Sequence, residues 1–185
     1  VLTAQADTIA KEDELFIYKI RYEDVDAGDS ARFELITAPP SMEIDSIEGI
    51  ISWTPTNDDR DQNFEVIYSA QDGLGATDID TFNLFVLNVN DPPVLATLDD
   101  YGFAEDSSLT LLFSDWFDKV DDIDNHDTTL SWQVFAFQTA NAVISGDTLT
   151  ISGPLNWFGP DTGKVVVSDG ELTDTTELAI FISPV

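Results

Sequence analysis

The stretch that decides the fold is "FNLFVLNVNDPPV", residues 82–94. In its first half, apolar side chains occupy alternate positions on both faces, which is the period-two pattern of a β-strand. The second half carries oxygen-bearing side chains and then the Pro92-Pro93 pair. Proline fixes its own φ and keeps the preceding residue extended. The stretch therefore predicts a strand that ends in a rigid connection, unlike a passive linker of glycine and serine.

Alternating apolar segments recur on both sides of this stretch, each bounded by Gly, Asp, Pro or Asn. They are "ELFIYKI" (14–20), "FEVIYSAQ" (64–71), "SLTLLF" (108–113), "LSWQVF" (130–135), "DTLTISG" (147–153), "GKVVVSD" (163–169) and "ELAIFI" (177–182). Many short strands separated by turn residues predict an all-β protein built as a β-sandwich. Only "SDWFDKV" (114–120) has the pattern of a short helical turn.

Acidic residues mark an internal repeat. Glu12 and Glu105 each precede an alternating strand, 93 positions apart (105 − 12). The Asp-Gly of "SAQDG" (69–73) matches that of "VVSDG" (166–170), and a final alternating strand follows each. The sequence therefore predicts two tandem domains, 1–91 and 92–185, each of a size suited to a seven-stranded, immunoglobulin-like Greek-key sandwich.

The charge of the chain limits its partners. It has 36 acidic against 7 basic residues, a formal net charge of -29. Nucleic acid is excluded as a natural partner, because phosphate binding needs clustered Lys and Arg, and anionic membranes are disfavoured. The absence of cysteine excludes disulfides and thiolate metal sites. A divalent cation would relieve the self-repulsion of so acidic a body.

Pairs of aspartates recur at matched places in the two predicted domains. Asp24-x-Asp26 and Asp122-x-Asp124 each put two carboxylates on one side of an extended loop, where they repel each other unless a cation lies between them. Calcium takes six to eight oxygen ligands at about 2.3–2.6 Å, so loops from both domains would have to contribute. The alternative interpretation is that these aspartates are ordinary turn residues and that Asp-Gly is an ordinary hairpin signal.

The sequence resembles the cadherin-like modules of bacterial surface proteins. The first domain resembles the dystroglycan-type cadherin-like domain through "APPSMEID" (38–45), "GIISWTPTNDD" (49–59), "FEVIYSAQDG" (64–73) and "NDPPV" (90–94). The second resembles cadherin-like tandem repeats through "AEDSSLTL" (104–111), "DDIDN" (121–125) and "NWFGPDTGKVVVSDG" (156–170). Residues 136–145 have no counterpart in that resemblance.

The resemblance implies Ca²⁺ held at the junction of the two modules. The residues that match the family's ligand positions are Glu12, Asp59, Asp61, Asn88, Asn90, Asp91, Asp122, Asp124 and Asp169. Asn88 stands where the family usually has aspartate. Asp24, Asp26 and Asp72 would form a weaker half-site at the other end of the first module, to be completed by a preceding module, and Glu105 would serve a following one.

The predicted function is that of calcium-binding modules of a large secreted or surface-anchored bacterial protein, acting in adhesion or as a calcium-stiffened spacer. The expected partners are neighbouring modules of the same chain, with a protein or polysaccharide ligand as a further possibility; direct membrane insertion is not expected. The two alternatives are a carbohydrate-binding module and a metal-free immunoglobulin-like stalk. An exposed Trp116, or a groove lined by Phe117 and Tyr101, would favour carbohydrate binding, although burial in the core is the preferred interpretation of Trp116.

Catalysis has little support in the sequence. His126 is the only histidine, it lies in a polar loop, and there is no cysteine for a nucleophile. No Gly-x-Ser-x-Gly motif surrounds a serine. Paired carboxylates could imitate a glycosidase, but small sandwich domains lack the deep cleft that raises the pKa of one of them. We therefore expect no enzymatic activity. Trp53 and Trp132 lie in alternating strands and are expected in the core.

Overall fold

The computed structural model describes residues 1–3, 6–23 and 31–185. Contacts between residues divide the chain into two units, Val1–Val89 and Asn90–Val185. Asn90 and Asp91 therefore belong to the second unit. The sequence predicted the boundary two residues later, after Asp91. The two units are described separately. No described helix is both long and apolar enough to cross a membrane.

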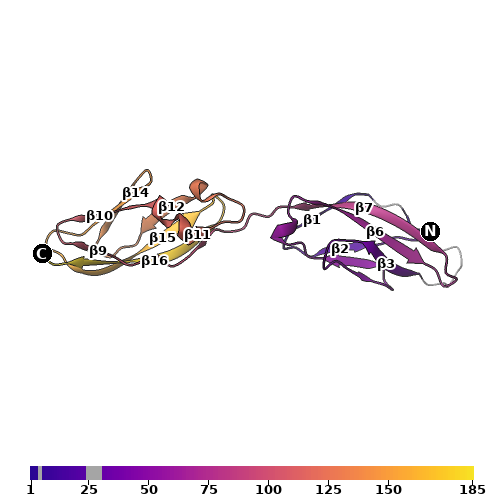
Figure 1. The fold of residues 1–185 in the computed structure, drawn as a ribbon. Helices are drawn as coiled ribbons and strands as arrows, with labels where there is room; N and C mark the ends of the chain where they lie inside the picture. Colours follow the sequence, from indigo (N-terminus) through magenta and orange to yellow (C-terminus); the bar gives the residue numbers. More distant parts are fainter. Residues whose placement is uncertain (4–5, 24–30) are drawn as a thin grey trace. The chain divides into compact units, whose positions relative to one another are not determined.

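Unit 1 is a sandwich of two sheets (Figure 1). The four-stranded sheet has the order β1 (Thr8–Lys11), β7 (Thr77–Leu87), β6 (Asn63–Gln71) and β3 (Arg32–Thr37). The three-stranded sheet has the order β2 (Phe16–Lys19), β5 (Ile50–Trp53) and β4 (Glu43–Asp45). β1 runs parallel to β7, and the other neighbours are antiparallel. A short 3₁₀ helix, Asn57–Asp59, precedes β6.

Unit 2 repeats this topology. Its four-stranded sheet has the order β9 (Tyr101–Ala104), β16 (Thr173–Ser183), β15 (Gly159–Ser168) and β12 (Ser131–Phe135). Its three-stranded sheet has the order β10 (Ser108–Leu112), β14 (Thr148–Ser152) and β13 (Asn141–Ser145). β9 is parallel to β16, as β1 is to β7. The all-β class and the tandem repeat predicted from the sequence are confirmed.

Unit 2 also has short elements outside these two sheets. β8 (Val94–Leu95) pairs with β11 (Val120–Asp121), where unit 1 has an isolated bridge between Leu2 and Tyr22. Two 3₁₀ helices, Phe113–Lys119 and Asp127–Thr129, lie in the connection between β10 and β12. The first confirms the helical turn predicted at 114–120, and its Trp116 is only 2% exposed, with the indole N–H donating to the Tyr101 hydroxyl.

Each unit has its own apolar core, because the alternation of each strand turns one face inward. In β7, Phe82, Leu84 and Val86 are buried, as the alternation of the opening stretch predicts. Trp53 is buried in the core of unit 1. Trp132 is half-buried and packs against the core of unit 2, stacked on Phe113 with ring centroids 5.5 Å apart.

A backbone N–H at the start of each unit is bound by an aspartate of its last strand. Leu2 N–H donates to Asp78 Oδ2 at 2.7 Å, and Leu95 N–H donates to Asp174 Oδ2 at 2.8 Å. Each pair joins the first and last segments of a unit. The two units therefore share this hydrogen bond as well as the strand pattern that the sequence predicts.

The loop before β13 lies in the segment 136–145, which has no counterpart in the resemblance to cadherin-like repeats. A buried carboxylate of β15 holds this loop. Asp161 accepts the backbone N–H groups of Thr162 and of residues 138–140. Burial alone would raise the pKa of Asp161, but these N–H donors outweigh it and lower the pKa below its ordinary value. Gly163 makes room for the same loop, since a Cβ there would lie 2.6 Å from the Phe137 ring.

Truncation of Leu149 should destabilise unit 2 alone. Leu149 is fully buried in the core of unit 2, so Leu149→Ala should lower the free energy of unfolding of that unit by about 2–5 kcal/mol. Residue-resolved amide hydrogen exchange should show the loss in β10, β13 and β14, with β5 and β6 unchanged. Leu155→Ala is the control, because Leu155 is 79% exposed. Equal loss of protection in both units would contradict separate cores.

The stability of unit 2 should fall in acid through Asp161. Because the pKa of Asp161 is lowered in the folded state, its stabilising contribution is complete above the unfolded pKa and is lost as the pH falls through the folded pKa. Denaturant unfolding followed from about pH 6 to about pH 2 should give a flatter profile for Asp161→Asn than for wild type. Asp147→Asn, an exposed change of equal charge, should keep the wild-type slope; a parallel loss in both variants would refute the assignment.

Candidate functional site: acidic ends of the two units

In unit 1, the predicted ligand Glu12 lies directly after β1, beside the end of β7. Its backbone N–H donates to the Leu87 carbonyl, and its Oε1 accepts the N–H of Val89 at 2.6 Å. The side chain is fully buried, and its Oε2 accepts no hydrogen bond from the described residues. A buried carboxylate oxygen without a donor is costly in an apolar environment. Glu12 therefore holds the backbone that follows β7 in place through Oε1. Its Oε2 has no hydrogen-bond donor among the described residues and could bind another partner.

Other predicted ligands of unit 1 lie around the same strand end. Asp61 has a left-handed backbone (φ 57°), and its N–H donates to the Val86 carbonyl, next to the carbonyl that binds Glu12. Asn88 is exposed and follows β7 directly. Asp59 has a different role, because its Oδ2 accepts the backbone N–H and the hydroxyl of Thr56 at 2.9 Å each and so caps the 3₁₀ helix.

In unit 2, five predicted ligands form one hydrogen-bonded group. Asn90 donates its side-chain N–H to Asp169 Oδ2 at 2.8 Å, and the Asp91 backbone N–H donates to Asp124 Oδ2 at 2.7 Å. Asp122 Oδ1 in turn accepts the N–H of Asp124 at 2.9 Å. The structure thus brings together residues from the start of the unit, from the loop after β11 and from the turn between β15 and β16.

Sequence reasoning missed one member of this group, Asn125. Its backbone N–H donates to Asp122 Oδ1 at 2.8 Å, and its side-chain amide reaches Asn90 Oδ1 at 3.4 Å. The signal was present in "DDIDN" (121–125), since an aspartate commonly accepts the N–H groups of the residues two and three positions later. That spacing places Asn125 beside the aspartate pair.

Most carboxylates of the group use one oxygen for the backbone. Asp169 Oδ1 accepts the N–H groups of Glu171 and Leu172 at 2.7 Å each. The Leu172 N–H, the Asn90 amide and the Glu171 N–H together lower the pKa of Asp169. Oδ2 of Asp91 and Oδ2 of Asp122 are buried and accept no hydrogen bond from the part of the chain that the structure describes. These anions are therefore held in place with oxygens left for a further partner.

The donor set suits calcium, which prefers carboxylate, amide and carbonyl oxygens. The buried oxygens of Glu12, Asp91 and Asp122 are the observation that fits such an ion. Within each unit as it stands, however, residues 1–3, 6–23 and 31–185 contain no group of three or more His, Asp or Glu side chains arranged to hold a metal.

The predicted N-terminal half-site is represented by Asp72 alone, because Asp24 and Asp26 lie outside the described residues. Asp72 Oδ1 accepts the N–H groups of Leu74 and Ala76 at 3.0 and 2.8 Å. Asp169 of the other unit also accepts the N–H two positions later, but its second donor is the N–H three positions later and not four. Glu105 repeats Glu12: its Oε1 accepts the N–H of Val185 at 2.9 Å.

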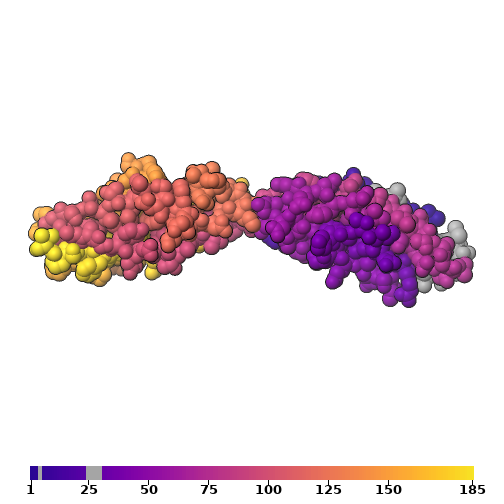
Figure 2. Space-filling view, in the orientation of Figure 1, coloured from indigo at the N-terminus to yellow at the C-terminus, as the bar shows by residue number. Residues whose placement is uncertain are grey.

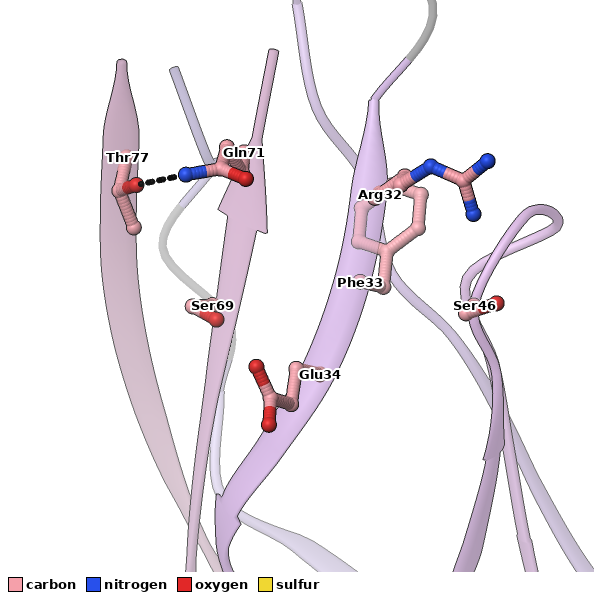
Figure 3. A pocket seen from close by; sticks show the side chains of 7 residues that line it. All are labelled: Arg32, Phe33, Glu34, Ser46, Ser69, Gln71 and Thr77. Atoms are coloured by element: carbon pink, nitrogen blue, oxygen red, sulfur yellow. Dashed lines mark hydrogen bonds between the residues drawn. The ribbon is translucent and has the colours of Figure 1, made fainter. Parts of the chain in front are cut away.

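The grooves of the described surface are shallow. On the face seen in Figure 2, the described residues of neither unit form a deep hollow. One groove of about 410 Å³ in unit 1 is lined by Phe33, by Ser46 and by polar side chains of β3, β6 and β7, with Gln71 donating to the Thr77 hydroxyl at 3.3 Å (Figure 3). His126 is exposed and pairs with the neighbouring Thr128. With Trp116 buried, the exposed stacking platform that would favour carbohydrate binding is absent at that position.

Two comparisons bear on the fold. A family model described as "Putative Ig domain" matches residues 1–87. No curated protein matches the sequence. Among solved structures, the extracellular cadherin domains 1-5 of protocadherin gamma B2 match with a TM-score of 0.56 and 13% identity, covering 100% of this chain and 39% of that one.

Two further cadherin structures span much of this chain. Human mucin-like protocadherin EC1-2 matches with a TM-score of 0.51 and 16% identity over 100% of this chain and 98% of its own. Mouse cadherin-23 EC22-24 matches with a TM-score of 0.54 and 14% identity over 98% and 63%. An endo-fucoidan hydrolase from glycoside hydrolase family 107 matches over 28% of its own length. Its TM-score of 0.40 is too low to support an argument. The likeness in fold to tandem cadherin domains confirms the cadherin-like, immunoglobulin-like architecture expected from the sequence.

Removal of the Asp122 carboxylate should loosen the acidic loop of unit 2. Asp122→Ala deprives the N–H groups of Asp124 and Asn125 of their acceptor, and each such bond is worth about 1 kcal/mol. Exchange of these two amides should therefore accelerate by about fivefold or more. Asp121→Ala removes the same charge one residue earlier and is the control. Unchanged exchange in Asp122→Ala would mean that the loop is held by other contacts.

Proposed function

We propose that this chain is a pair of calcium-binding, cadherin-like modules of an extracellular or cell-surface protein, acting in adhesion or as a spacer that calcium stiffens. The observation that carries the proposal is the set of buried carboxylate oxygens of Glu12, Asp91 and Asp122 that accept no hydrogen bond from the described residues. In a chain of net charge -29, few side chains could neutralise them. A hard divalent cation would both neutralise the negative charge of these carboxylates and coordinate their oxygens.

The ligands proposed for calcium come from two sets that flank one peptide bond of the chain. Glu12, Asp61 and Asn88 belong to the end of unit 1, which includes Val89; Asn90 and Asp91 begin unit 2. Asp122, Asp124 and Asp169 are joined to Asn90 and Asp91 by hydrogen bonds inside unit 2. Asp59 is the weakest candidate, because its carboxylate already caps a 3₁₀ helix.

The mechanism follows from mutual repulsion. Without a cation, the two acidic sets repel each other and the units move about the connection at residues 89–91. With calcium bound by both sets, the shared ligands restrain that movement, and binding free energy is converted into rigidity between modules. Pro92-Pro93 keeps the start of unit 2 extended.

Calcium should stabilise the chain through these ligands. Extracellular modules bind with dissociation constants of about 10⁻⁴–10⁻³ M, so about 10 mM calcium should add about 1.4–2.7 kcal/mol to the free energy of unfolding relative to chelator. Thermal melting and calorimetric titration measure the effect, and small-angle scattering should show a narrower distribution of distances within the molecule. Asp91→Ala should lose all three responses.

Asp100→Ala removes the same charge from an exposed position in the same unit and should behave as wild type. Identical melting and scattering curves with calcium and with chelator would instead support a metal-free immunoglobulin-like stalk. Binding of calcium without a change in scattering would keep the metal site and refute the stiffening.

A further inference from the structure

One part of unit 2 differs from the rest of this acidic chain. Residues 128–146 contain no Asp, Glu, Lys or Arg, and this is the longest uncharged run in the sequence. The run includes β12 and β13, and these strands are in contact with each other. Each is the terminal strand of its sheet. The uncharged run therefore forms one lateral edge of the unit 2 sandwich.

The same edge of unit 1 is charged. β3 and β4 occupy the positions that β12 and β13 have in unit 2. β3 carries Arg32 and Glu34, and β4 carries Glu43 and Asp45. Charged residues on an edge strand are a common means of preventing its pairing with another chain. Unit 1 has this protection, and unit 2 lacks it.

The registers show which residue replaces the protecting charge. Glu43 pairs with Ser52 of β5, which in turn pairs with Ile17 of β2. Val143 pairs with Thr150 of β14, which in turn pairs with Thr110 of β10, 93 positions after Ile17 (110 − 17). Val143 thus stands where unit 1 has Glu43. It is 53% exposed, and the neighbouring Ile144 is 39% exposed.

β13 is self-complementary in an antiparallel arrangement. If two copies paired about Val143, Asn141 would face Ser145, Ala142 would face Ile144, and Val143 would face its own copy. Polar residues would meet polar residues at the ends and apolar residues would meet at the centre, with no charge against a like charge. A strand pair about a twofold axis is an isologous contact, which closes at two copies.

We propose that β13 is a homotypic interaction surface through which two copies of this chain pair edge to edge, antiparallel about Val143. A second copy is the occupant that the charges favour: each copy carries a net charge of -29, so like copies can approach with least repulsion at an edge without charge. The inference does not rest on calcium binding.

The predicted pairing is weak and depends on salt in a characteristic way. A five-residue ladder buries less area than a stable dimer interface needs, so the complex is transient. The acidic bodies repel at low ionic strength, and salt screens that repulsion while leaving backbone hydrogen bonds and apolar contacts in place. Association should therefore strengthen with salt, whereas a contact made by ion pairs would weaken.

Sedimentation velocity of the intact 185-residue chain in chelator, over a range of concentrations, tests the proposal. In about 1 M NaCl the wild-type sedimentation coefficient should rise with concentration, and in about 50 mM NaCl it should rise less. Val143→Glu, which restores the glutamate that unit 1 has at the matching position, Glu43, should lower the association constant at least tenfold, as should Val143→Lys. Val143→Thr keeps a β-branched residue without charge and should retain association.

Ile79→Glu also replaces a β-branched apolar residue by glutamate, in β7 of unit 1, where Ile79 is 59% exposed, and is the matched control. Circular dichroism and melting confirm that each variant is folded. A wild-type chain that stays monomeric at all concentrations and salt levels overturns the proposal. So does association that Val143→Glu and Ile79→Glu reduce equally, because the contact would then lie elsewhere or depend on total charge.

Discussion

The bond between an aspartate oxygen and a backbone N–H is the interaction on which the rest of this structure depends. With 36 acidic and 7 basic residues, most carboxylates have no cationic side chain to meet, and ion pairs such as Lys11–Glu14 lie at the surface. Backbone amides take their place. They form the turns at Asp72 and Asp169, hold the loop at Asp161, and join the first and last segments of each unit through Asp78 and Asp174.

The same bonds explain why acidity does not prevent folding. A carboxylate that accepts N–H groups is stabilised in its charged form, as the lowered pKa values of Asp45, Asp161 and Asp169 illustrate. In the turns of Asp45 and Asp169 one oxygen accepts both backbone N–H groups, whereas Asp161 uses both of its oxygens. The carboxylate oxygens that accept no hydrogen bond from the described residues are the ones that the proposed cation would bind.

Much of the fold could be predicted from the sequence, because alternation and turn residues are local signals. The long strands β6, β7, β15 and β16, the repeat and the helical turn at Trp116 followed from them, but β1, β3, β4 and β9 did not. β13 did not, since its loop is held by Asp161, which lies more than twenty positions away. Nor could spacing reveal that Asp59 caps its own helix or that Asn125 joins Asn90, because both depend on how a side chain turns.

The candidate site was predictable in part for the same reason. The Asp-x-Asp pattern places Asp122 and Asp124 in one loop, but only the fold brings Asp169 to Asn90 across a separation of 79 positions. Glu12 was placed by resemblance, and its burial and its bond to the Val89 N–H became evident only in the structure. Local pattern thus predicted part of the candidate site, and long-range topology decided which of its residues are neighbours.

The bond from Leu2 to Asp78 also affects how the chain can fold during its synthesis. Its partners are 76 positions apart, and those of the Leu95–Asp174 bond are 79 apart, so neither can form until the last strand of its unit has left the ribosome. Contacts this distant in sequence make folding slow, and an unfinished unit exposes unpaired strands. Because the cores are separate, unit 1 can complete its fold while unit 2 is still being translated, which limits the length of unfolded chain exposed at any time.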